Sequence, residues 1–408
     1  MDIGCRILGM VSGARVRSAA AAVEAKRRQE EEAKAAAARA AAEKVERAAR
    51  EKEEAARKAQ EEKERAAQAS KEAAQSAAVA ASAAAAPAAA PPQAPPASAA
   101  EVKGSPGALA WREQLAGLLA KARGEVAAFK ADPATKAARR AVDKALTVNV
   151  QQISASRDQV AKKATAIQQL LLSQPAGPPA TYAQLQLASK LCVQCEVQVT
   201  RLPGFAFPLA EVAVAVCARV PGFVELLVAQ LAALCPLCAP ALVVPRPGKE
   251  DDAQALRLQG YKITKDPDTG QVSCEPRDEY VARMGAMARF YGALMQCDDP
   301  QNPHGLKQAW TWLARFLNGV PPSHASAAVL NGFLHVGGWR LYRAYRQQAG
   351  KLFQAALSQW LPQLAALGNP DTRADLTRIQ AYFERNEWNQ EPEGKALPQF
   401  DASSYDRA

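Results

Sequence analysis

Residues 278–319 constrain the fold of this chain most, because they encode two amphipathic helices separated by a short break. Apolar side chains recur there at steps of three and four: Tyr280, Met284, Met287, Tyr291 and Leu294, then Leu306, Trp310, Leu313 and Leu317. Such spacing places each set on one stripe of a helix. We expect Asn302 to cap the second helix and Pro303 to lie in its first turn. The pattern predicts an antiparallel helix pair at the core of an all-α domain.

The N-terminal quarter has a different composition. Residues 17–78 consist almost entirely of Ala, Glu, Lys and Arg, which favour helices, and contain neither Pro nor Gly. This predicts a long charged helix. A coiled coil needs large apolar residues where this stretch has mostly alanine, so a solvated single helix and self-association both stay open. Residues 79–106 are rich in Pro and Ala and predict a disordered linker.

The remaining chain divides around these two segments. Residues 1–16 form a tail, 107–178 a helical lead-in, 179–390 the main domain and 391–408 a second tail. In the lead-in, Leu146, Ile153, Val160 and Ile167 recur at intervals of seven, which predicts a seam along another helix. We expect further helices at 108–130, 181–200, 207–220, 223–234, 322–336, 339–366 and 371–386, with a proline-rich loop at 236–251. The helices show no fixed-period repeat, so any solenoid is irregular.

The net charge of +10 is concentrated in the first half of the chain. Residues 1–179 carry 29 basic and 20 acidic side chains, whereas residues 180–400 carry 21 and 19. A nearly neutral domain argues against a broad nucleic-acid footprint, and we expect no direct sequence-specific binding of nucleic acid. Residues 226–245 are uncharged, but three prolines interrupt them, so they predict a core segment rather than a membrane span. Eight cysteines without a clear secretory signal are expected to be reduced.

The cysteines form two CxxC pairs, Cys192/Cys195 and Cys235/Cys238. Four thiolates can bind zinc, but 39 residues separate the pairs, far more than in a compact zinc ribbon. Both pairs lie in or beside apolar helices, where cysteine is a common core residue. The sequence also lacks the Walker A, GxGxxG, HExxH and GxSxG motifs. We therefore predict no metal site and no enzyme.

Two residues of the second helix region are candidates for partner binding. His304 lies in a Pro-His-Gly sequence at a helix start, where a structural turn contact is the ordinary role. Trp312 is two positions from Trp310 and must point away from the stripe that contains Trp310. We therefore expect Trp312 to face the surface.

Several motifs in register resemble those of the GLE-type mRNA export mediators. The resemblance covers roughly residues 140–390. The matching stretches lie at 148–160, 189–199, 205–216, 223–236, 256–261, 280–296 and 302–318; the last of these, NPHGLKQAWTWLARFLN, is the most specific.

This resemblance implies an irregular HEAT-like domain, similar to the helicase-binding middle domain of the large translation-initiation scaffold. It implies a non-enzymatic factor at the cytoplasmic face of the nuclear pore, and also in the cytoplasm. Such a factor binds a DEAD-box RNA helicase and stimulates its ATPase cycle, which promotes mRNA export. Nucleoporins and translation initiation factors are further implied partners. Family members carry a coiled coil before the domain, in the place of residues 17–78 here.

The resemblance also implies an inositol hexakisphosphate site, and here the sequence departs from the family. Relatives have a histidine/lysine run before a Cys-Pro pair, whereas this chain has an uncharged run that includes Gln230, Ala233 and Leu234. Lys190 and Arg283 are the remaining candidate polyphosphate ligands, and each has an alternative role as a surface charge or helix ion pair. A polyphosphate needs several cationic donors at once. We therefore expect weak binding or none.

Two other functions stay open. One is a general helical scaffold in translation initiation or termination that docks partners without controlling an ATPase. The other is a metal-dependent factor built on the CxxC pairs. The effect of the chain on helicase turnover distinguishes the first from an activator, and metal content tests the second.

Overall fold

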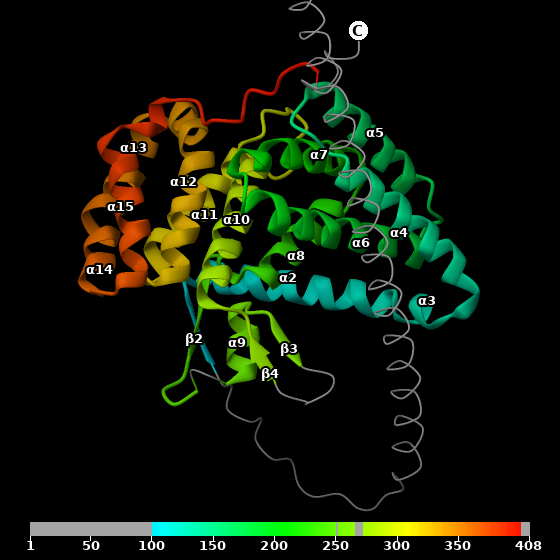
Figure 1. The fold of residues 1–408 in the computed structure, drawn as a ribbon, viewed down its shortest axis with the longest axis horizontal. Coiled ribbons are helices and arrows are strands. Elements are labelled where there is room, and N and C mark those ends of the chain that lie inside the picture. Colours follow the sequence, from blue (N-terminus) through cyan, green and yellow to red (C-terminus); the bar gives the residue numbers. More distant parts are fainter. Residues whose placement is uncertain (1–99, 250–251, 266–271, 401–408) are drawn as a thin grey trace, which may run out of the picture. The chain divides into compact units, whose positions relative to one another are not determined.

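The computed structural model describes residues 100–249, 252–265 and 272–400. The predicted tail 1–16, the charged helix 17–78, the linker up to residue 99 and residues 401–408 lie outside the described residues. The described chain is mainly α-helical, so the predicted fold class is confirmed (Figure 1). All described residues belong to one unit of the chain, 96–408.

The elements follow one another with short connections. The α-helices are α2 (Pro106–Glu125), α3 (Ala127–Ala131), α4 (Lys136–Gln151), α5 (Arg157–Leu172), α6 (Pro178–Gln194), α7 (Ala206–Arg219), α8 (Phe223–Leu234), α9 (Ala253–Gln259), α10 (Arg277–Gln296), α11 (Leu306–Gly319), α12 (His324–Tyr345), α13 (Gln347–Ala355), α14 (Leu361–Ala366) and α15 (Pro370–Glu384). The π turns are η2 (Cys195–Val199) and η5 (Ala356–Trp360), and the 3-10 turns are η1 (Pro133–Thr135), η3 (Pro203–Phe205), η4 (Pro236–Cys238) and η6 (Glu387–Asn389). The strands are β1 (Ala100–Gly104), β2 (Ala241–Pro245), β3 (Ile263–Lys265) and β4 (Val272–Cys274).

The helices form two rows that share one hydrophobic core (Figure 1). In one row α5, α7, α10, α12 and α15 contact each other in that order, and in the other α4, α6, α8 and α2 do so. Each helix is apolar on the side that faces its neighbours, so the rows bury one continuous core. The finer prediction of a HEAT-like repeat remains a prediction.

Helix α10 is the centre of this core, and its most extensive contact is with α12 rather than with α11. Two glycines explain the close approach: a Cβ on Gly332 of α12 would lie 2.6 Å from the carbonyl oxygen of Gly285 on α10. The predicted helices within 278–319 are therefore confirmed, but α12 replaces α11 as the main partner of α10. The fully buried aromatic side chains around this contact are Phe290, Tyr291, Trp312, Phe316 and Phe333.

The predicted cap at Asn302 is wrong, because α11 begins only at Leu306, after Gly305. The Asn302 side chain instead closes the α10–α11 loop. Its Oδ1 accepts the backbone N–H of His304 at 3.0 Å, and its Nδ2 donates to the Leu294 carbonyl at 2.8 Å. Pro303 also lies outside the helix.

The predicted heptad seam is divided between two helices. Leu146, Ile153, Val160 and Ile167 are all buried as expected, but Ile153 lies in the break between α4 and α5. Ser156 begins the second helix, because its hydroxyl accepts the backbone N–H of Gln159 at 3.4 Å. The regular spacing therefore marks core positions, without a continuous coiled coil.

The strands β1 and β2 correct two sequence predictions. β1 comes from the end of the predicted linker and β2 from the predicted proline-rich loop, and they pair antiparallel with Ala100 opposite Pro245. Ala100, Val243 and Ala255 of α9 form a small core of their own, which stabilises this pair. The short strands β3 and β4 also pair antiparallel, with Ile263 opposite Cys274.

The C-terminal helices also differ from the prediction at one boundary. α12 continues through Gly337 and Gly338 and ends at Tyr345; the next residue, Arg346, has a left-handed φ of 45°. A side chain at Gly338 would collide with the Tyr382 hydroxyl, so this glycine serves helix packing rather than helix termination. None of the described helices combines the length and the hydropathy needed to cross a bilayer.

Candidate functional site

Arg283 lies on the first half of α10, and the structure surrounds it with acceptors. Its guanidinium binds Glu275 with two hydrogen bonds, Nη2 to Oε2 at 2.5 Å and Nε to Oε1 at 2.9 Å. Nη2 also donates to the Gly260 carbonyl at 2.8 Å. Gly260 ends α9 with φ 96°, and a Cβ there would lie 2.6 Å from the Leu234 carbonyl, so only glycine fits.

Two further charges complete what we call the Arg283 cluster: Arg283, Glu275, Glu196 and Lys262. Nη1 of Arg283 lies 3.9 Å from Oε1 of Glu196, and Nζ of Lys262 lies 2.5 Å from the other Glu196 oxygen. The Arg283 side chain is 5% exposed. Burial alone would lower the pKa of Arg283, but the hydrogen bonds to Glu275 and the negative charges of Glu275 and Glu196 together outweigh burial, and the pKa is raised. The cluster is therefore charge-balanced, and its arginine is internal.

Neither Lys190 nor the end of α8 provides a basic surface beside this cluster. Lys190, half-buried on α6, donates to Oγ1 of Thr147 on α4 at 2.8 Å. Gln230 accepts a hydrogen bond from Arg123 at 3.2 Å, while Ala233 is exposed and Leu234 half-buried. The last turn of α8 therefore presents no charge of its own.

These contacts test whether the predicted residues fit inositol hexakisphosphate. Several cationic groups must converge on so highly charged a ligand. The Arg283 guanidinium is instead paired with carboxylates inside the protein, and Lys190 donates a hydrogen bond to a hydroxyl on a different helix. The structure gives no direct contact between Lys190 and Arg283 among the described residues. Lys190 and Arg283 therefore do not converge on one polyphosphate site.

Trp312, predicted to face the surface, is 1% exposed, so this prediction is wrong. Its indole Nε1 donates to the Leu237 carbonyl at 3.0 Å. Its ring contacts Phe333, with centroids 4.2 Å apart, and Phe316, with centroids 4.9 Å apart. Trp310 is the half-buried tryptophan of the pair, and its ring lies against Tyr345. The buried face of α11 is thus rotated from the predicted stripe.

His304 makes the predicted structural contact, because its Nε2 lies 2.9 Å from the Tyr291 hydroxyl. Burial lowers the pKa of His304 to about 4, so the imidazole is neutral at pH 7. Burial also raises the pKa of Tyr291, which keeps the phenol protonated. A role of His304 in partner binding stays a prediction.

Sequence reasoning missed a cavity of ≈ 310 Å³ beside His304, which we call the Trp111 pocket. Its walls come from the start of α2, the second half of α10, the loop before α11 and α11 itself. The lining residues are Trp111, Tyr291, His304, Lys307, Gln308, Thr311, Trp312 and Arg315. No acidic side chain lines it. The only sequence signal was the NPHG stretch, because nothing local places Trp111 nearby.

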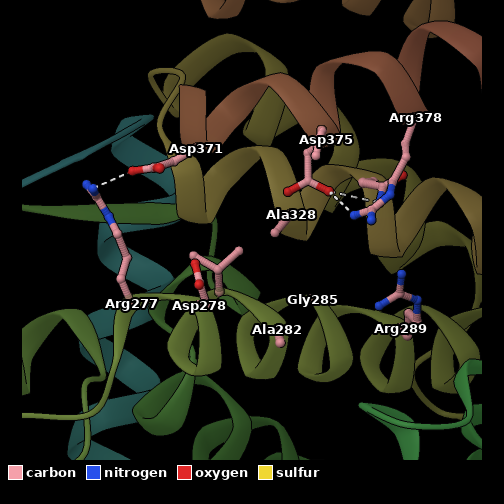
Figure 2. A pocket seen from close by; sticks show the side chains of 12 residues that line it. Arg277, Asp278, Ala282, Gly285, Arg289, Ala328, Asp371, Asp375 and Arg378 are labelled. Atoms are coloured by element: carbon pink, nitrogen blue, oxygen red, sulfur yellow. Dashed lines mark hydrogen bonds and ion pairs between the residues drawn. The ribbon is translucent and has the colours of Figure 1, made fainter. Parts of the chain in front are cut away.

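A second missed cavity, of ≈ 330 Å³, lies between α10, α12 and α15 (Figure 2). We call it the interhelical cleft, and it contains three arginines and three aspartates. Arg277 binds Asp371 at 2.5 Å, and Arg378 binds Asp375 at 3.2 Å. Arg289 points into the cleft from α10 (Figure 2), and burial lowers its pKa. The charges of this cleft therefore balance.

The CxxC cysteines are core residues. All four side chains are fully buried, and the thiol of Cys195 donates to the Ala286 carbonyl at 3.3 Å. Burial raises the pKa of Cys192 and of Cys195, which favours their protonated thiols, whereas the hydrogen bond from Cys238 lowers the pKa of Cys235. Within the residues that the structure describes, no group of three or more potential ligands can hold a metal ion.

Comparison with known proteins places these observations in a family. A family model described as GLE1-like protein matches residues 119–357. The mRNA export factor GLE1 of Rattus norvegicus is 30% identical over 229 residues, which is 54% of this chain and 32% of that protein. The Mus musculus protein of the same name is 29% identical over 310 residues, covering 70% of this chain and 43% of the relative. The chain thus spans less than half the length of these relatives.

Solved structures support the fold. One chain is similar to this protein in a solved complex of the S. cerevisiae Dbp5 C-terminal domain with Gle1 and IP6. The TM-score is 0.62 and the sequence identity is 18%. The likeness covers 72% of this chain and 98% of the matched one. A second structure of such a complex gives a TM-score of 0.57. At this identity the likeness concerns the fold alone.

Proposed function

Because this chain belongs to the GLE1-like protein family, we propose that it is a non-enzymatic mRNA export factor that binds a DEAD-box RNA helicase and stimulates its ATPase cycle. The observation that carries the proposal is the family match over residues 119–357, which includes most of the helical core. Relatives over this region are named mRNA export factors. The matched yeast structure holds Gle1 together with Dbp5.

The fold suits such a role physically. A DEAD-box ATPase has two lobes that close on ATP and RNA. A scaffold that binds the open arrangement more tightly than the closed one shifts the equilibrium towards opening and speeds product release. The continuous core of this chain, from Leu115 to Leu397, provides rigid surfaces for such a contact.

We further propose that the protein works at the cytoplasmic side of the nuclear pore and in the cytoplasm. Nucleoporins would then anchor it there, and translation initiation factors are further proposed partners. Self-association through the charged N-terminal helix concerns residues outside the described ones and stays a prediction.

We also propose that inositol hexakisphosphate binds this chain weakly or not at all. The internal position of Arg283 and the uncharged end of α8 support this proposal. Stimulation of the helicase should then not depend on the inositol phosphate.

The decisive experiment measures the RNA-stimulated ATPase rate of the partner DEAD-box helicase, with and without the full chain, each with and without inositol hexakisphosphate. Equal stimulation in both conditions supports the activator and the loss of the polyphosphate site. Stimulation that requires the inositol phosphate supports the proposal that the chain activates the helicase, and contradicts the proposal that it does not bind inositol hexakisphosphate. Binding without any change of rate favours the plain scaffold.

A further inference from the structure

We propose that the Trp111 pocket binds a nucleotide unit, with the base on the indole of Trp111 and the phosphate between Lys307 and Arg315. The inference is independent of the proposed helicase activation. It rests on an aromatic wall, two cations and polar side chains that surround one cavity of ≈ 310 Å³.

The aromatic wall offers a stacking surface. Trp111 is half-buried, and its ring is within 19° of parallel to the imidazole of His304, with the two centroids 6.3 Å apart. Because Trp111 lines the cavity, its ring is available there as a stacking surface. Aromatic side chains bind bases this way with little dependence on sequence, because every base has a π face.

His304 is fixed and uncharged in this wall. Its Nε2 is held by the Tyr291 hydroxyl at 2.9 Å, and with a pKa of about 4 the ring stays neutral at pH 7. It therefore lines the cavity as a neutral polar ring. The half-buried Gln308 adds an amide donor and acceptor at the same cavity. These groups can hydrogen-bond the edge of a base.

The charge of the pocket comes from Lys307 and Arg315. Arg315 has room beside the start of α2 because Gly107 lacks a side chain: a Cβ there would lie 3.1 Å from Nη2 of Arg315. No ion pair of Lys307 or Arg315 is found within the described part of the chain. Two cations without a lining carboxylate favour an anionic group, and phosphate suits both donors.

The interhelical cleft makes a useful contrast, because it is of similar volume and also holds arginines. There, Asp371 and Asp375 already bind Arg277 and Arg378 (Figure 2). No aromatic side chain lines that cleft. Of the two cavities, only the Trp111 pocket combines positive charge with a stacking surface.

Two probes distinguish the sources of such a ligand: 5′-AMP and a fluorescent ten-residue oligoadenylate, each titrated against the full chain. Binding of the oligoadenylate that 5′-AMP displaces indicates a mononucleotide site, and binding without displacement indicates single-stranded RNA. In either case we expect Trp111→Ala to weaken binding about fivefold or more, the loss of one stacked base. Trp111→Phe should retain most of it.

Cation variants provide the second readout, because they leave the core intact. The double variant Lys307→Gln/Arg315→Gln should reduce the slope of log affinity against log salt for the oligoadenylate by about 0.7, the value for one phosphate on a single strand. The matched control is Arg140→Gln/Lys144→Gln, two exposed cations on α4. Equal affinities and slopes for the pocket and control variants, or no binding of either probe, would overturn the proposal.

Discussion

The Arg283 cluster and the Trp111 pocket both bring basic side chains together, but they use them differently. In the cluster, Arg283 is 5% exposed and binds Glu275 and the Gly260 carbonyl, so its charge serves the fold. In the pocket, Lys307 and Arg315 line an open cavity that contains no carboxylate. A basic residue is therefore informative about ligands only when its partners are known, and the partners of Arg283 are the reason why we propose that it is not a polyphosphate ligand.

The strongest test of this comparison is Arg283→Ala. Removing the guanidinium leaves Glu275, whose side chain is 7% exposed, without its partner. Breaking a buried ion pair in this way lowers the free energy of unfolding by about 3–5 kcal/mol. Urea denaturation of the full chain measures the loss.

Arg277→Ala is the matched control, because Arg277 and Asp371 also lie 2.5 Å apart but their side chains are 50% and 44% exposed. An exposed pair of this kind contributes about 1 kcal/mol or less. Equal losses in the two variants would mean that Arg283 is not an internal structural residue, and its candidacy as a ligand would return.

The buried imidazole of His304, which lines the pocket, makes the stability of the fold depend on pH. Its pKa of about 4 in the folded chain lies below the ordinary value of 6.5 because the ring is buried. The unfolded chain therefore binds the proton more readily, and stability is lost as pH falls below 6.5. Lowering the pH from 7 to 5 should therefore reduce the free energy of unfolding by about 2 kcal/mol through His304.

The measurement is urea denaturation at both pH values for the wild type and for His304→Gln. We expect the variant to lose about 2 kcal/mol less than the wild type over this interval. His324 and His335, whose pKa values are also lowered by burial, are present in both proteins and cancel in the comparison. Identical pH dependence would show that His304 is accessible and protonates freely.

Trp312→Phe tests whether this tryptophan belongs to the core. The change keeps an aromatic ring but leaves the Leu237 carbonyl without the indole N–H that it accepts at 3.0 Å. We expect a loss of about 1.5 kcal/mol in the free energy of unfolding, with helicase binding unchanged. Trp310→Phe, at the half-buried position, should change stability less. A variant of Trp312 with normal stability and weakened partner binding would contradict this assignment.

These residues also show which features the sequence can predict. Helix positions followed from local spacing, since the period of apolar residues depends only on neighbours along the chain. The face that α11 buries did not follow, because Trp310 and Trp312 both fit a local pattern. The choice depends on Leu237, 75 residues away, whose carbonyl accepts the indole N–H of Trp312.

The candidate sites likewise combine contacts between residues close in the sequence, which can be predicted, with contacts between distant residues, which cannot. Glu275 lies only eight residues before Arg283, so this ion pair could have been predicted from the local sequence. Glu196, by contrast, joins the cluster from the π turn η2, which lies far away along the chain. Trp111 and Arg315 are brought together only by the packing of α2 beside α11, which no local signal encodes. Likewise, β1 and β2 pair across more than 130 residues, and their proline-rich surroundings predicted loops.

The smallest expected effect concerns Lys190. Its hydrogen bond to Thr147 joins two partly exposed side chains, so Lys190→Ala should change the free energy of unfolding by about 1 kcal/mol or less. Isothermal titration with inositol hexakisphosphate should give the same weak or undetectable heat for the variant and the wild type, because a single lysine without converging cations does not form a polyphosphate site. Lys307→Gln is the informative counterpart, since it removes a pocket cation and should weaken oligoadenylate binding. If Lys190→Ala instead abolished tight binding of the inositol phosphate, the distinction between internal and available basic residues would fail at this position.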